Sequence, residues 1–121
     1  MRYEQILRHY NVQLSRDIIK LISDETQRIQ KHHPQAISCS VTLTRPHRRH
    51  HKGDGVRAQV SVALPGRHLV STKEAGGHSE SENALTALFN AFDAAERLAH
   101  TYLDRRYAGK TRRSHVAPVP A

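Results

Sequence analysis

The chain has 121 residues, enough for one compact domain but not for two, and its 19 Lys and Arg outnumber 11 Asp and Glu. The formal net charge of +8, to which ten histidines add as the pH falls, favours an anionic partner such as a nucleic acid. The sequence has no apolar run that could span a bilayer and no apolar core of a secretion signal at its start. We therefore expect a cytoplasmic protein with no membrane partner.

The first two predicted elements are a strand and a helix. Residues 5–13 are weakly strand-like. A helix is then predicted from about Arg16 to Lys31, because Ser15 can cap it and Pro34 stops it. Its apolar residues recur at helical spacing: Ile18, Leu21, Ile22 and Ile29.

Residues 37–44 and 56–64 alternate between apolar and polar side chains, a pattern typical of half-buried strands. The only cysteine, Cys39, lies on the apolar face, so we expect it to be buried, and no disulfide can form within the chain. A tight turn at Pro65-Gly66 then leads into a third neighbouring strand over residues 68–73.

A second, longer helix follows the break at Gly76-Gly77, where Ser79 and Glu82 form a capping box. We expect its apolar stripe to lie in the core: Leu85, Leu88, Phe89, Phe92, Ala95, Ala99, Tyr102 and Leu103. Beyond Gly109 the chain is basic and lacks apolar clusters, which is typical of disorder. The predicted organisation is a domain over residues 1–108 and a disordered tail over residues 109–121.

This order of elements predicts an α+β fold, a single β-α-β-β-β-α domain whose four-stranded sheet carries both helices on one face. The other face should be free and polar, without a large hydrophobic residue. The residues expected on it are Ser38, Ser40, Thr42, Arg57, Gln59 and Ser61.

The loop between the two alternating strands, Pro46-His47-Arg48-Arg49-His50-His51-Lys52-Gly53, is the densest positive segment of the chain. Because a strand hairpin would hold it rigidly, we expect it to contact RNA phosphates. Other cations can extend this surface along one side of the domain. The candidate RNA-binding residues are Arg45, His47, Arg48, Arg49, His50, His51, Lys52, Arg57, Arg67, Arg97, Arg105, Arg106 and Lys110.

Several alternatives to an RNA-binding loop remain. The loop can be a solvated turn, or His47, His50 and His51 can ligate a transition metal, although their spacing matches no standard zinc finger. Protonation of these histidines can also raise RNA affinity as the pH falls. A general module for structured RNA is the other alternative. We expect no cofactor and no enzyme activity, because the sequence has no recognisable catalytic constellation.

The segments that carry a resemblance to a known family are Ile37-Ser38-Cys39-Ser40-Val41, the basic loop Pro46 to Gly53, Val60-Ser61-Val62-Ala63-Leu64-Pro65-Gly66, Leu69-Val70 and Ala91-Phe92-Asp93-Ala94-Ala95-Glu96-Arg97. Through these segments the chain resembles the ribosome hibernation promoting factor family over residues 5–108. The closest resemblance is to short forms with a His-rich loop. It implies binding to the small ribosomal subunit and its rRNA in the channel for messenger and transfer RNA, and silencing of idle ribosomes. DNA is not an expected partner.

The chain differs from the family pattern at three positions. Arg49 stands where a histidine is expected, Asn83 where an aromatic residue is usual, and Glu96 where a basic residue is common. The C-terminal domain by which long forms pair ribosomes is also missing, so we expect a short form. An exposed edge strand can pair two chains, and we expect a monomer or a weak dimer.

Overall fold

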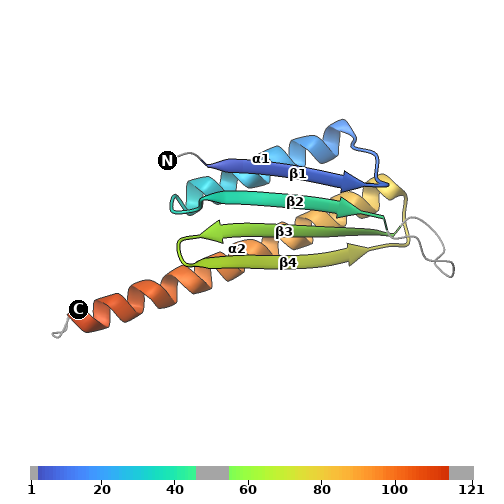
Figure 1. Ribbon diagram of the computed structural model, residues 1–121. Helices are drawn as coiled ribbons and strands as arrows, with labels where there is room; N and C mark the ends of the chain where they lie inside the picture. Colours follow the sequence, from blue (N-terminus) through green and yellow to red (C-terminus); the bar gives the residue numbers. More distant parts are fainter. Residues whose placement is uncertain (1–2, 46–54, 115–121) are drawn as a thin grey trace.

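The computed structural model describes residues 3–45 and 55–114. The elements in chain order are β1 (Glu4–Tyr10), α1 (Arg16–His32), β2 (Ser38–Thr44), β3 (Val56–Leu64), β4 (Arg67–Ala75) and α2 (Glu80–Ser114). The strands form one sheet in the order β1-β2-β3-β4, and both helices lie on the same face of it (Figure 1). The predicted α+β architecture is confirmed.

The two central strands, β2 and β3, form the middle of the sheet, and β1 and β4 pair with their outer edges. β2 and β3 pair antiparallel along their whole shared length, with Thr44 opposite Arg57 at one end. Along both strands buried residues alternate with more exposed ones, as the sequence pattern predicts. Cys39 is fully buried on the helix side, and this burial raises the pKa of its thiol to about 11. β4 pairs antiparallel with β3, and β1 pairs parallel with β2.

Helix α2 packs closely on β3 and β4 because its sheet-facing side consists largely of alanine. These small side chains bring the helix backbone near the sheet, while Leu88 and Phe92 fill the remaining space, with exposed fractions of 0% and 1%. The buried alanines are Ala84, Ala87, Ala91, Ala95 and Ala99.

One member of the predicted apolar stripe does not lie in the core. Phe89 is 58% exposed, although Phe92 on the same helix is buried. At 3.6 residues per turn, Leu88, Phe92 and Ala95 align on one side of the helix, whereas Phe89 is rotated out of that line. The prediction that both phenylalanines belong to the core is therefore wrong for Phe89.

The free face of the sheet is polar in the middle and apolar at its margins. The pairing register places Ile6 beside Ser40, Tyr10 beside Thr44, and Val70 beside Ser61, all on the face opposite the helices. Tyr10 is 55% exposed and Val70 is 50% exposed. The expectation of a face without large hydrophobic residues holds for β2 and β3 but is wrong for the outer strands.

Two elements end at different residues than the sequence predicts. β1 ends at Tyr10 rather than Gln13, because Asn11 has a φ of 62° and turns the chain out of the strand. α2 continues past Gly109 to Ser114, since a single glycine costs a helix only about 1 kcal/mol. Residues 115–121, the rest of the predicted tail, lie outside the described part. None of the described helices is both long and apolar enough to cross a membrane.

Replacement of Phe92 by alanine should lower the free energy of unfolding by about 3–5 kcal/mol, because it leaves a cavity between α2 and the sheet. Phe89→Ala is the matched control on the same helix and should cost much less, because Phe89 is mostly exposed. Urea denaturation measures both values. Equal losses in the two variants would contradict the packing described above.

Candidate nucleic-acid interface

The basic segment predicted from the sequence leaves the sheet at the end where β2 finishes and β3 begins. Residues 46–54 lie outside the described part, and with them the candidate contacts His47, Arg48, Arg49, His50, His51 and Lys52. Their contacts, and the metal-binding alternative for the three histidines, stay predictions. The structure does describe the base of this loop, where Thr44 and Arg57 form the last residue pair.

Arg45 is held at the base of the loop by contacts with three residues, Glu80, Tyr10 and Asn11. Its guanidinium lies 3.1 Å from a carboxylate oxygen of Glu80 at the start of α2, and its backbone N–H donates to the carbonyl of Tyr10. The side chain of Asn11 donates to the Arg45 carbonyl at 3.3 Å. The other oxygen of Glu80 accepts from the backbone N–H of Gln13 at 2.9 Å. The loop therefore begins from a well-ordered corner.

Arg57 lies across the hairpin from Thr44, on the free face of the sheet. Both its Nε and one terminal nitrogen lie 2.9 Å from the same oxygen of Glu74 on β4. The two side chains are 36% and 52% exposed, and such surface pairs contribute about 0–1 kcal/mol. A phosphate group can therefore compete for Arg57 at little cost.

The other candidate arginines do not share one side of the domain with Arg57. Arg67 follows the β3–β4 turn at the opposite end of the sheet, with its guanidinium 5.8 Å from the centre of the Tyr102 ring. Arg97 pairs with Asp93 at 2.8 Å on α2, and Arg105 is exposed further along that helix. The side chains of Arg106 and Lys110 lie outside the described part.

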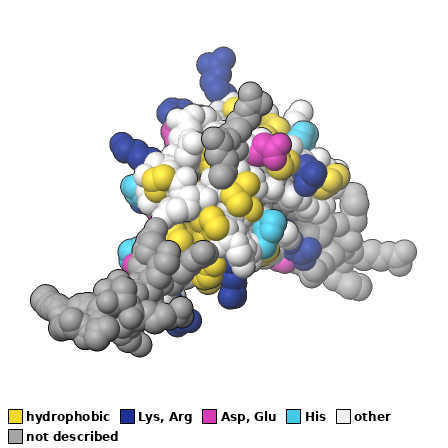
Figure 2. Space-filling model, turned by 60° about the vertical axis from the view of Figure 1, so that its left-hand side comes forward, with side chains coloured by type: hydrophobic (Ala, Val, Ile, Leu, Met, Phe, Trp, Pro, Cys, Tyr) yellow, Lys and Arg dark blue, Asp and Glu magenta, His cyan; other side chains and the backbone are white. Residues whose placement is uncertain are grey.

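The expectation of a single basic side is thus wrong for the described arginines, which are divided between the helix layer, the free face and both ends of the sheet. Figure 2 shows one face of the molecule, where hydrophobic side chains gather near the middle and Lys and Arg side chains lie apart from one another towards the rim. Sequence alone places Arg57 on a strand, but it does not reveal which cations end up adjacent.

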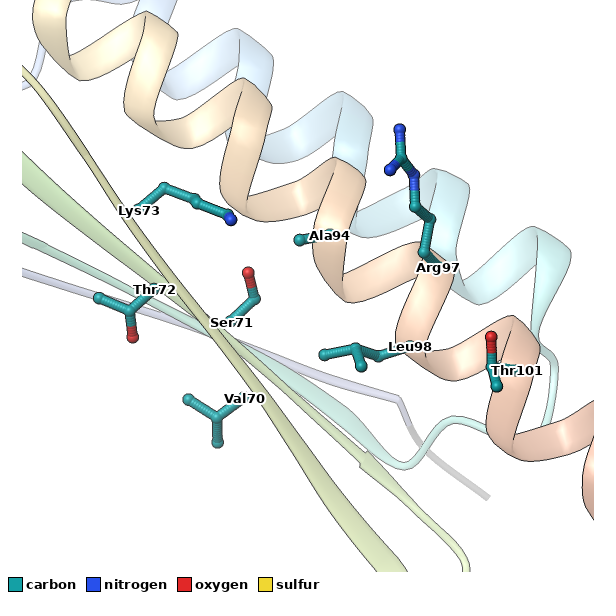
Figure 3. Close-up of a pocket in the computed structure, with 8 residues that line it drawn as sticks. All are labelled: Val70, Ser71, Thr72, Lys73, Ala94, Arg97, Leu98 and Thr101. Carbon is teal, nitrogen blue, oxygen red and sulfur yellow. The ribbon is translucent and has the colours of Figure 1, made fainter.

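A cation that sequence reasoning missed, Lys73, lines a groove between β4 and α2. The groove has a volume of about 480 Å³. Lys73 and Leu98 point into it from opposite sides, whereas Arg97 points away along the helix (Figure 3). Lys73 pairs with Ala58 on β3, so it belongs to the helix-facing residues of β4. The predicted strand over residues 68–73 already contains Lys73, and its alternation with Leu69 and Ser71 would have placed it on the helix-facing side.

Asn83 orders the turn that precedes α2. It is 1% exposed, its side-chain nitrogen donates to the carbonyl of His78 at 2.9 Å, and its oxygen accepts from the N–H of the same residue at 3.2 Å. Beside it, Ser79 and Glu82 form the predicted capping box. Asn83 thus has a polar structural role at the position where the resemblance led us to expect an aromatic residue.

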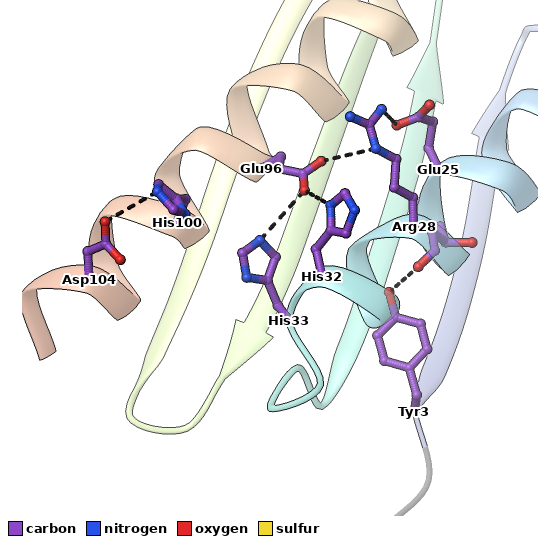
Figure 4. A network of polar contacts seen from close by, with 9 residues as sticks. Tyr3, Glu25, Arg28, His32, His33, Glu96, His100 and Asp104 are labelled. Carbon is purple, nitrogen blue, oxygen red and sulfur yellow. Dashed lines mark hydrogen bonds and ion pairs between the residues drawn. The ribbon is translucent and has the colours of Figure 1, made fainter. Parts of the chain in front are cut away.

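Glu96 joins the two helices. Its carboxylate lies 2.6 Å from Nδ1 of His32, 3.7 Å from Nε of Arg28 and 3.7 Å from Nε2 of His33 (Figure 4). Arg28, in turn, lies 3.6 Å from Glu25. The sequence marks Glu96 as a departure from the family, but its partners are far away along the chain and could not be predicted.

His33 lies beneath this cluster and is 6% exposed. Burial lowers the pKa of His33 below its ordinary value, and this effect outweighs the opposing attraction of Glu96. Its Nε2 atom has no hydrogen-bond partner among the described residues. His33 is therefore a neutral, buried histidine at neutral pH.

Replacement of Asn83 by alanine should lower the free energy of unfolding by about 1–3 kcal/mol, because two backbone groups of His78 lose their partner. Asn90→Ala, at an exposed position of the same helix, should change it by less than about 0.5 kcal/mol. Thermal or urea denaturation distinguishes the two variants. A neutral effect of Asn83→Ala would show that the turn does not need this side chain.

Acid should destabilise the protein through His33. Because the fold disfavours protonated His33, its contribution to stability is complete above the ordinary histidine pKa of about 6.5 and is lost as the pH falls below it. His33→Gln should therefore lose less stability than the wild type between pH 7.5 and 5.5. His68→Gln, at an exposed position, is the control and should keep the wild-type pH dependence. Identical pH profiles for wild type and His33→Gln would contradict this assignment.

Comparison with known proteins identifies the family. The family model for sigma 54 modulation protein / S30EA ribosomal protein matches residues 6–107. A ribosomal subunit interface protein from Coxiella burnetii has a similar structure, with a TM-score of 0.56, 14% identity, and coverage of 87% of this chain and 98% of that one. The N-terminal domain of Thermus thermophilus Protein Y is also similar, with a TM-score of 0.53, 19% identity, and coverage of 87% of this chain and 98% of that one. No curated protein sequence matches. The chain therefore belongs to the sigma 54 modulation/S30EA ribosomal protein family, a family of ribosome-associated hibernation factors and not of enzymes.

Proposed function

We propose that this protein binds the rRNA of the small ribosomal subunit, in the channel for messenger and transfer RNA, and thereby inhibits translation in the cytoplasm. The observation that carries the proposal is the family match, which extends over residues 6–107 and so includes the sheet, the basic loop and most of α2. The net charge of +8 agrees with an RNA partner.

The end of the β2–β3 hairpin is the part of the surface best suited to contact rRNA. Arg45 and Arg57 flank residues 46–54, which add Arg48, Arg49 and Lys52 to them. The hydrogen bonds and the ion pair that hold Arg45 give this end a fixed position relative to the sheet. Contacts made from a rigid base lose less conformational entropy on binding than contacts made from a flexible chain.

The free face of the sheet beside this end can follow a sugar-phosphate backbone. One row across the four strands consists of Arg8, Thr42, Gln59 and Thr72, all polar. Tyr10 lies in the next row, beside Thr44, and its exposed ring can stack on an unpaired base. This arrangement supports recognition by backbone and shape, with few contacts to individual bases.

Neutralisation of the loop should abolish most of the binding to small subunits. In R48Q/R49Q/K52Q we expect weaker co-sedimentation, and the slope of log affinity against log salt should fall in magnitude by about 2, because up to three phosphate contacts are lost. The control R16Q/K20Q/K31Q removes the same charge from exposed positions of α1 and should retain more affinity than the loop variant. Equal losses in both variants would show that only net charge matters.

The same sedimentation assay separates ribosome binding from the two alternatives. Addition of an excess of duplex RNA should displace the protein only weakly. Complete displacement would favour a general module for structured RNA, and loss of binding on addition of a chelator would favour metal ligation by His47, His50 and His51. A protein that stays at the top of the gradient in low salt would overturn the proposed function.

A further inference from the structure

The contact between α1 and α2 opens into a second groove, separate from the hairpin end and from the groove beside β4. It has a volume of about 480 Å³ and lies over the Glu96 cluster. Its titratable lining comes from both helices, with His32 and His33 at the end of α1 and His100 on α2. Three histidines in one groove can change its charge within a narrow range of pH.

Around this groove, negatively charged carboxylates outnumber the arginines. Two arginines, Arg28 and Arg97, face four acidic side chains. The acidic residues are Glu25, Asp93, Glu96 and Asp104. With neutral histidines the cluster therefore carries a charge of −2, and with all three histidines protonated it carries +1.

The carboxylates also contact the arginines and histidines that could otherwise bind a phosphate. Glu96 contacts Arg28, His32 and His33, and Asp104 lies 3.2 Å from Nε2 of His100 (Figure 4). Asp93 contacts Arg97 at 2.8 Å. An approaching phosphate thus meets net negative charge and cations that already have partners. The geometry closes the groove to RNA at neutral pH.

We propose that the α1–α2 groove is a proton-gated site for the phosphate backbone of RNA. The groove repels RNA at neutral pH and binds it in mild acid. The proposal rests on the proposed function, to which it adds regulation by pH. His32 and His100 are the histidines that can contact a ligand directly, because their side chains are 47% and 70% exposed. Glu96 is the positioning residue that keeps the groove closed.

Buried His33 sets the limit of this response. Burial lowers the pKa of His33, so it accepts a proton at a lower pH than an ordinary histidine. Once charged, His33 adds a positive charge beneath the cluster, where burial disfavours it and Glu96, 3.7 Å away, attracts it. The gate therefore consists of two exposed histidines that line the groove and one buried histidine whose protonation is disfavoured by burial.

The first test compares the affinity of the full chain for purified small subunits at pH 7.5 and 5.5, at one salt concentration. We expect tighter binding in acid, by about tenfold, since a single charge-assisted contact is worth that much. H32Q/H100Q should lose most of this increase, measured as the ratio of its own affinities at pH 5.5 and 7.5. H68Q, which also removes a titrating imidazole but lies on the opposite sheet face, should keep the full increase.

Glu96→Gln is a second test, in which the affinity at pH 7.5 should increase. It removes one negative charge and the partner of His32, so affinity at pH 7.5 should rise and the difference between pH 7.5 and 5.5 should shrink. Histidine signals in NMR spectra, followed during titration with inorganic phosphate and with a short RNA hairpin at pH 5.5, show whether the groove responds to free phosphate or only to RNA.

The outcomes separate this proposal from the proposed function. If wild type binds small subunits but H32Q/H100Q keeps the full acid response and E96Q binds like wild type at pH 7.5, the gate is refuted and the ribosome-binding function stands. In that case the loop histidines His47, His50 and His51 account for the response. If wild type does not bind small subunits at either pH, the proposed function fails first.

Discussion

The burial of one face of β2 and β3 against α2 is the interaction on which the rest of the structure depends. Residues on this face are almost completely buried along both strands, and the buried side of α2 is mostly alanine. A shift of one residue in either strand would turn its apolar side chains to solvent, so the register is strongly specified. The pairing of Thr44 with Arg57, and hence the place where the basic loop leaves the sheet, follows from this register.

This constraint separates two kinds of charged surface. At the hairpin end, the packed sheet holds Arg45 and Arg57 in place, and Glu80 and Glu74 neutralise them only through partly exposed pairs. Between the helices, Glu96 pairs with Arg28 and His32 in a compact cluster over buried His33. The hairpin end is the surface that the proposed function uses, and the α1–α2 groove is the surface that we infer to depend on protonation. The division explains how a chain of net charge +8 can have a helix face that is locally acidic.

The fold was predictable from the sequence because its strongest patterns describe local structure. Alternation in 37–44 and 56–64, the capping box at Ser79 and the turn at Pro65-Gly66 each depend on neighbours within a few residues. Phe89 was misplaced because an apolar residue beside a helical stripe reads as part of it, and only packing decides which side faces the sheet. The apolar margin formed by Tyr10 and Val70 depends on pairing between strands, which the weak pattern of β1 did not reveal.

The candidate site was less predictable, because it depends on contacts between distant residues. The sequence identified the cations near the hairpin, but not their partners, such as Glu74 beside Arg57 and Tyr102 beside Arg67. The role of Glu96 could not be inferred, since a carboxylate on a helix gives no signal of the histidines that face it from another element. Long-range side-chain placement requires the structure even where every secondary element is predicted well.

The orientation of the hairpin on the ribosome is the most direct test of the central claim. Cys39 is fully buried, so a cysteine introduced at Thr44, near the loop, or at His68, at the opposite end of the sheet, can carry a tethered iron probe that cleaves nearby RNA. We predict strong cleavage of small-subunit rRNA from position 44 and weaker cleavage from position 68. Strong cleavage from position 68 with none from position 44 would contradict binding through the end of the β2–β3 hairpin.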